Sequence, residues 1–110
     1  MSVTLGRVDI RQDGLVLPLN GYAATTTLTQ NDYTAIFDAT TGNLIANLPS
    51  SVASPGRVYI IKKGDATANT VTIDAFGADT IDGAGTLVLT AANQRSKIQS
   101  DGNGVWHVID

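Results

Sequence analysis

The chain has 110 residues, no cysteine and a formal net charge of −3. This length suits one small domain, and the lack of cysteine excludes disulfides and thiolate metal sites. The seven Lys and Arg residues form no basic patch in the sequence of the kind that nucleic-acid binders carry. The first residues lack the apolar core of a signal peptide and no run reaches the ~18 apolar residues of a membrane span, so we expect synthesis in the cytoplasm of the producing cell and neither a nucleic acid nor a membrane as partner.

The first 30 residues contain two strand-like pieces, VTLGRVDI and GLVLPL, and then the polar run TTTLTQ. Because unpaired strand edges seek partners, residues 1–30 predict either an arm that is exchanged between subunits or laid on a partner, or an ordinary edge hairpin. The apolar residues expected to make the attachment are Val3, Leu5, Val8, Ile10, Leu15 and Leu17.

From residue 31 onward, apolar and polar residues alternate with a period of two, which is typical of strands. Strands are predicted at 33–38, 44–48, 57–62, 70–73, 86–89, 95–100 and 105–109, with turn-forming residues between them. The best helical candidate, TAANQ at 90–94, is too short to stand alone. The pattern predicts an all-β fold, a single antiparallel β-sandwich or barrel-like domain over residues 31–110.

Four stretches of this domain together carry a known pattern. They are NDYTAIFDATTGNLIANLP (31–49), GRVYIIKKGDATANTVTID (56–74), ADTIDGAGTLVLT (78–90) and IQSDGNGVWHVI (98–109). The pattern resembles a small β-module of tailed-phage virion structural proteins, which occurs in decoration (cement) proteins and in tail-fibre and tail-tip domains. The resemblance implies a structural component of a phage particle and gives the segment before residue 31 no counterpart.

The acidic residues raise the question of a metal site. All ten of them are Asp, which favours turns by accepting hydrogen bonds from nearby backbone amides. Asp82 precedes a glycine, a pair that favours positive φ in tight turns, and residues 101–104 (DGNG) suit a hairpin. A calcium loop at 101–104, or a cation held by Asp74, Asp79 and Asp82, is the alternative, but a calcium loop needs further acidic ligands and usually a late Glu. We expect turns, and neither a metal nor a cofactor.

Catalysis has few candidate residues. Asp79 and Asp82 are the carboxylate pair that a glycosidase would need, and His107 is the sole histidine for a Ser/His/Asp arrangement. His107 lies in the predicted strand VWHVI, where a histidine is more often part of the sheet than of a triad. The sequence therefore predicts no enzyme and no catalytic residue.

Two groups of side chains remain as candidates for binding. Trp106, Tyr59 and Tyr33 would suit a sugar platform, but a tryptophan is usually buried and the alternation pairs Trp106 with Val108 as core residues. The basic residues expected to contact a partner, or simply to form a solvated face, are Lys62, Lys63, Arg95 and Lys97.

Charged residues make up 15% of the chain, against about 25% in an ordinary soluble domain, which suggests surface shared between copies. We therefore expect a homotrimer located in the virion, with the major capsid protein or another virion protein as its partner. A segment of 30 residues before the module is long enough for an arm but not for a fibre shaft, which favours a capsid decoration protein that stabilises the head shell. The alternatives are a tail-fibre or tail-tip module that binds a host surface glycan or protein, and a small carbohydrate-binding protein without a particle.

Overall fold

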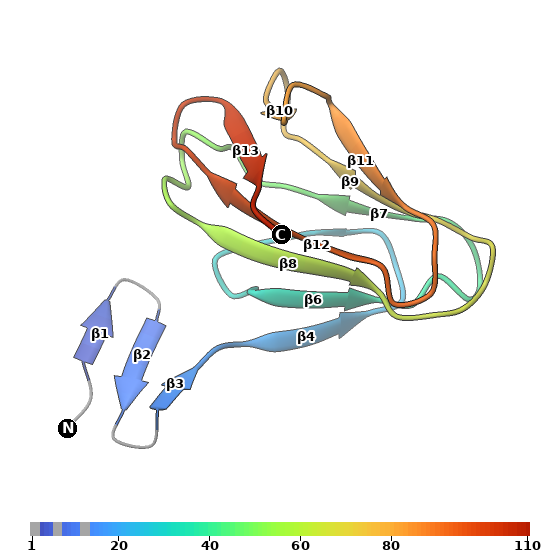
Figure 1. The fold of residues 1–110 in the computed structure, drawn as a ribbon, viewed down its shortest axis with the longest axis horizontal. Coiled ribbons are helices and arrows are strands. Elements are labelled where there is room, and N and C mark those ends of the chain that lie inside the picture. The colour runs from blue at the N-terminus through green and yellow to red at the C-terminus, as the bar shows by residue number, and fades with distance from the viewer. Residues whose placement is uncertain (1–2, 6–7, 12–13) are drawn as a thin grey trace.

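The computed structural model describes residues 3–5, 8–11 and 14–110, and every regular element in them is a strand (Figure 1). The predicted all-β fold is confirmed. The strands are β1 (Val3–Leu5), β2 (Val8–Arg11), β3 (Gly14–Val16), β4 (Leu19–Tyr22), β5 (Thr26–Thr27), β6 (Thr34–Phe37), β7 (Leu44–Asn47), β8 (Val58–Lys63), β9 (Val71–Asp74), β10 (Thr80–Ile81), β11 (Thr86–Leu89), β12 (Arg95–Ser100) and β13 (Val105–Val108). They form three sheets, with the orders β1-β2-β3, β10-β13-β12-β8-β6-β4 and β11-β9-β7-β5.

The six-stranded and the four-stranded sheet together form the body of the molecule, and the chain passes back and forth between them. From β4 to β12 each successive strand belongs to the other sheet, and from β4 to β9 the neighbours within a sheet lie two steps apart in the chain. The pairs β4-β6, β6-β8, β5-β7 and β7-β9 are parallel, because each of these strands returns from the other sheet in its original direction, and β10-β13 is parallel as well. The expectation of an antiparallel domain is wrong for these strands, whereas β8-β12, β12-β13 and β9-β11 are antiparallel.

Side chains from both sheets meet in one buried cluster. Tyr59, Ile61 and Trp106 come from the six-stranded sheet, Val71 and Ile73 come from the four-stranded sheet, and all five are 0% exposed. The rings of Tyr59 and Trp106 stack with their centroids 5.5 Å apart. The predicted core position of Trp106 is confirmed, whereas that of Val108 is wrong, because its side chain is 38% exposed. Fully burying a large apolar side chain contributes about 1.5–3 kcal/mol, so this cluster is the main source of cohesion between the sheets.

Strands β4 and β5 belong to the body, although they precede residue 30. They pair with β6 and β7, and the Leu28 side chain that follows them is only 1% exposed. The buried Asp32 carboxylate accepts hydrogen bonds from the Tyr22 hydroxyl and, at 2.8 Å, from the Asn20 amide, and so ties β4 to the loop before β6. The hydrogen bond from the Tyr22 hydroxyl to Asp32 raises the pKa of Tyr22 to about 12. The division of function at residue 30 stays a prediction, but the two sheets of the body begin with β4 at residue 19.

The N-terminal meander, defined here as β1 to β3, is a sheet of its own. Its strands pair antiparallel with one another, and in the described residues they pair with no strand of the other two sheets. Figure 1 shows it standing clear of the body, to which the short link between β3 and β4 connects it.

Candidate interaction surfaces

The turn after β10 is built by Asp82 and Gly83. Their φ values are 48° and 90°, as predicted for a tight Asp-Gly turn, and Ile81 and Ala84 exchange backbone hydrogen bonds of 2.6 and 3.0 Å across it. Positive φ at both central positions is the requirement of a type I′ turn. Asp82 is therefore a turn residue.

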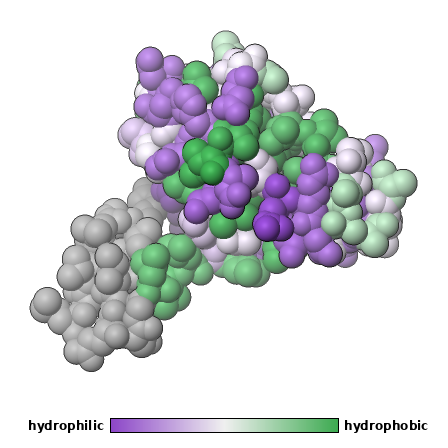
Figure 2. Space-filling view, viewed as in Figure 1, coloured by the Kyte–Doolittle hydropathy of each residue, from purple (hydrophilic) through white to green (hydrophobic). Residues whose placement is uncertain are grey.

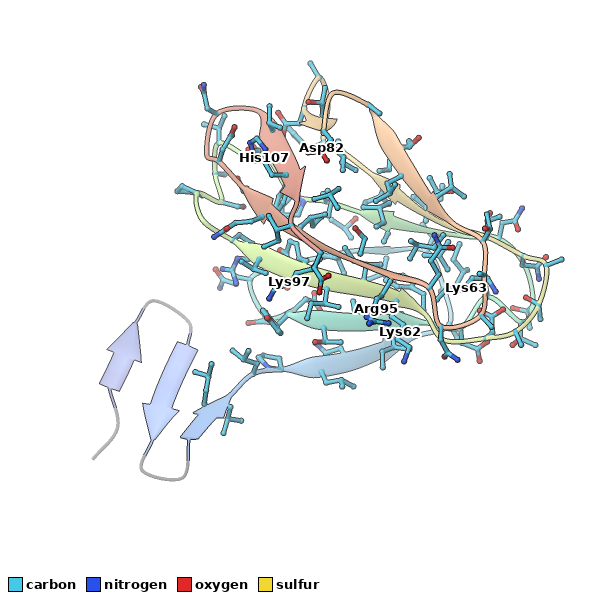
Figure 3. All side chains as sticks on the ribbon, viewed as in Figure 1. Lys62, Lys63, Asp82, Arg95, Lys97 and His107 are labelled. Atoms are coloured by element: carbon cyan, nitrogen blue, oxygen red, sulfur yellow. The ribbon has the colours of Figure 1, made fainter. Side chains whose placement is uncertain are left out.

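The predicted hairpin turn at residues 101–104 is confirmed, and its acid serves the backbone. Asp101 Oδ1 accepts hydrogen bonds from the amides of Asn103 and Val105 at 2.8 and 3.2 Å. Asp101 Oδ2 lies 3.0 Å from His107 Nε2, and this contact lowers the pKa of Asp101 below its ordinary value. His107 Nδ1 is 4.0 Å from Asp82 Oδ1, so the exposed imidazole links the turn after β10 to the turn before β13 (Figure 3). The contacts of His107 with Asp82 and Asp101 therefore hold these two turns next to each other.

Lys63 is not at the surface, and its predicted contact with a partner is wrong on that ground. The side chain is 0% exposed, and Nζ donates to Asp65 Oδ2 at 2.8 Å, to the Asp65 carbonyl at 3.1 Å and to the Thr67 carbonyl at 2.8 Å. Asp65 also accepts hydrogen bonds from the Ala39 amide and from Thr67. The hydrogen bonds from Lys63 and Thr67 lower the pKa of Asp65 well below its ordinary range. The pair closes the loop between β8 and β9.

Lys62, Arg95 and Lys97 do share one outward face, that of the six-stranded sheet (Figure 3). The strand register places Arg95 opposite Lys62 and Lys97 opposite Ile60, and Ile36 lies on the other side of Lys62. We call these five residues the cationic face. Within the described part of the chain, none of its three cations forms an ion pair, and the strands of this sheet contain no acidic residue. Arg95 and Lys62 are therefore like charges opposite each other, which is destabilising, and the nearest acidic residue along the sheet is Asp110, which is joined to Lys97 by backbone hydrogen bonds of 2.8 and 3.3 Å.

Exposed apolar residues gather where the meander joins the body. Leu15, Val16 and Leu19 are 56%, 54% and 65% exposed, Leu17 is half-buried, and Figure 2 shows apolar surface beside the grey N-terminal atoms. Of the predicted attachment residues, Leu15 and Leu17 are therefore accessible. The side chains of the remaining four, Val3, Leu5, Val8 and Ile10, lie outside what the structure describes.

The loops at one end of the body expose two further apolar side chains, which sequence reasoning missed. Val52 and Phe76 are 64% and 57% exposed. Their loops are joined because the Ser51 amide donates to Asp79 Oδ2 at 2.9 Å and the Gly104 amide donates to Ser51 Oγ at 3.2 Å. Phe76 is the first residue of the turn-forming stretch FGAD at 76–79, which was the available clue, since residues in loops are commonly exposed.

The aromatic residues proposed for a sugar platform are largely inside. Trp106 and Tyr59 are fully buried, and Tyr33 is half-buried. The Tyr59 hydroxyl donates to the Thr29 carbonyl at 2.9 Å, and burial raises the pKa of Tyr59 to about 12. Two of the three rings are therefore inaccessible to a sugar.

Within the described residues, no three His, Cys, Asp or Glu side chains are grouped so that they could hold a metal ion. The same residues include no helix with the length and apolar character needed to span a membrane.

The chain matches no model of a known protein family, and a search among curated proteins finds no match. The candidate sites of this protein are therefore defined by its own surfaces.

Proposed function

We propose that the protein is a non-enzymatic structural component of a bacteriophage particle, and specifically a homotrimeric capsid decoration protein that stabilises the head shell. The β-module resemblance of residues 31–109 motivates this proposal. The observation that carries it is the cationic face, on which three cations without an ion pair surround half-exposed aliphatic side chains. Such a surface suits contact with an acidic neighbouring protein.

In this role the two sheets act as a rigid β-sandwich body, and the work is mechanical. The cationic face lies against the shell, so that Ile36 and Ile60 are removed from water while Lys62, Arg95 and Lys97 meet carboxylates. Burial of apolar area contributes about 25 cal/mol per Å², and the added contact raises the force that is needed to separate shell subunits. The major capsid protein is the proposed partner, and no cofactor takes part.

The test uses phage particles assembled without this protein. Purified wild-type protein is added back, the bound fraction is measured after sedimentation, and immunogold labelling locates it on the head or the tail. We expect binding to heads and a higher temperature of head rupture. The double variant Lys62→Glu with Arg95→Glu should lose this binding, whereas Asp38→Asn, a charge change at an exposed residue outside the cationic face, should keep it. Absence of the protein from every particle fraction would sink the proposal.

A receptor-binding module at a tail tip is the second candidate function. It is favoured by the exposed Val52 and Phe76 on loops that are tied together at one end of the body. Recognition of a host surface glycan or protein through such loops would be lost in Phe76→Ala and kept in Lys62→Glu. Immunogold label on the tail, together with this pattern of binding to host cells, would replace the head proposal.

A further inference from the structure

The strand register of the N-terminal meander sorts its residues into two different faces. Val3 lies opposite Ile10, Leu5 lies opposite Val8, and Ile10 lies opposite Leu15. Directly opposed residues occupy the same side of a sheet, so these five aliphatic positions share one face, which we call the apolar meander face. The other face takes the positions Thr4, Asp9, Arg11, Gly14 and Val16.

At β3, where the exposure of the meander is described, the body does not cover it. Successive residues of a strand belong to opposite faces, and Leu15 and Val16 of β3 are 56% and 54% exposed. Both sides of the sheet are therefore open at β3, in agreement with its position clear of the body (Figure 1). These strands have only three or four residues, and a sheet with one apolar face must bury that face against another element.

The chemistry of the apolar meander face favours a second copy of the same chain as that element. All five positions carry uncharged aliphatic residues, so the face meets an identical face without repulsion between like charges. The cationic face differs in this respect, because Lys62, Arg95 and Lys97 would oppose themselves. A meander that projects from one end of the molecule also brings copies together there without a clash between their bodies.

We propose that the apolar meander face is the self-association surface of this protein, packed against the same face of other copies around their symmetry axis. This inference deepens the proposed function and rests on it only for the number of three copies. It leaves the cationic face free to contact the particle, and it assigns self-association to the first 16 residues.

The test compares two neighbouring residues of equal exposure on opposite faces of β3. The full chain is studied by light scattering on a sizing column and by sedimentation equilibrium, and emission of the single, buried Trp106 reports folding. We expect the wild type to have about three times the 11.4 kDa mass of the chain. Leu15→Glu should raise the concentration at which the oligomer dissociates by about 100-fold or more, because each copy would bury a carboxylate without a partner. Val16→Lys, the control on the other face, places a positive charge opposite Asp9 and should change it by less than about threefold, since exposed substitutions cost little.

Each result bears on one statement. A wild type that is monomeric at high micromolar concentration, or an equal effect of both variants, would overturn the inference. A dimer that Leu15→Glu dissociates would keep the surface and contradict the homotrimer. An oligomer that dissociates as expected but is absent from particles would keep this inference and contradict the proposed function.

Discussion

At the scale of single residues, Lys62 and Lys63 show how one step along a strand decides the role of a charge. Lys62 lies outward on the cationic face, and Lys63 lies inside with all three donors of its ammonium group satisfied. A buried charge is tolerated when it is paired and hydrogen-bonded in this way. Two adjacent and chemically identical residues therefore have opposite environments, one at the surface and one inside the fold.

The first prediction compares these two lysines. Lys63→Met should markedly lower the thermal midpoint of unfolding, because it leaves the largely buried Asp65 carboxylate without its cation. Lys62→Met, the matched control, should change the free energy of unfolding by no more than about 0.5 kcal/mol. Thermal unfolding followed by circular dichroism measures both. Equal midpoints for the two variants would contradict the buried role of Lys63.

The second prediction concerns acid stability. The folded structure lowers the pKa of Asp65 below the ordinary value of about 3.9, so the folded state keeps this carboxylate ionised at a pH where the unfolded state binds a proton. The resulting stabilisation is fully present above pH 4 and is lost as the pH falls from about 4 through the folded-state pKa. Denaturant midpoints of the wild type should therefore fall steeply below pH 4, and those of Asp65→Asn should start lower and fall less. A variant with the same slope as the wild type would refute the assignment.

At the scale of elements, the sequence predicted most strands but not their partners. Alternation is a local signal, and it located β6 to β9 and β11 to β13, of which β6 to β9 and β12 alternate between buried and more exposed residues throughout. Whether a strand pairs in parallel depends on the path that the chain takes between two strands, and no residue in β6 or β8 encodes that path. The strands β4 and β5 were not recognised as part of the body, because LNGY and TT are too short and too polar to show a period.

The same contrast applies to the candidate surfaces. Asp82 and the turn at 101–104 were predictable, since an Asp-Gly pair is a local signal for positive φ. The alignment of Lys62 with Arg95 was not, because it depends on the register between two strands that are 31 residues apart. Lys63 was misassigned for a related reason, since a lysine is rarely buried and its acceptors lie in a loop that follows it.

The third prediction uses two truncations to locate the start of the body. Removal of residues 1–18 should leave a folded protein, because the meander strands pair only with one another in the described structure. Removal of 1–30 also deletes β4, β5 and Leu28, and it uncovers Phe37, which packs against Tyr22 with ring centroids 5.4 Å apart. Loss of a buried leucine alone costs about 2–5 kcal/mol, so the shorter fragment should be largely unfolded. Emission of Trp106 and amide dispersion in NMR spectra distinguish the two results, and a well-folded fragment 31–110 would restore the boundary at residue 30.

At the scale of the whole molecule, charge is segregated between the two sheets. The strands of the six-stranded sheet contain four cations and no acid, and those of the four-stranded sheet contain Asp74 and no cation. Asp9 lies in β2 of the meander, and the other acids in the described residues lie in turns and loops or at the end of the chain. A protein with a net charge of −3 thus presents one face that attracts anions, and the whole-chain composition conceals it.

The last prediction follows from this segregation. At pH 7 and low ionic strength, the protein should be retained on a cation-exchange matrix in spite of its negative net charge, because the matrix interacts with the nearest face and not with the sum of all charges. The double variant Lys62→Gln with Arg95→Gln should lose this retention. Arg7→Gln with Arg11→Gln removes the same two positive charges outside the cationic face and should retain most of it. Retention should vanish above about 0.1 M salt, where the Debye length falls to about 10 Å, and identical elution of the two double variants would show that net charge alone governs binding.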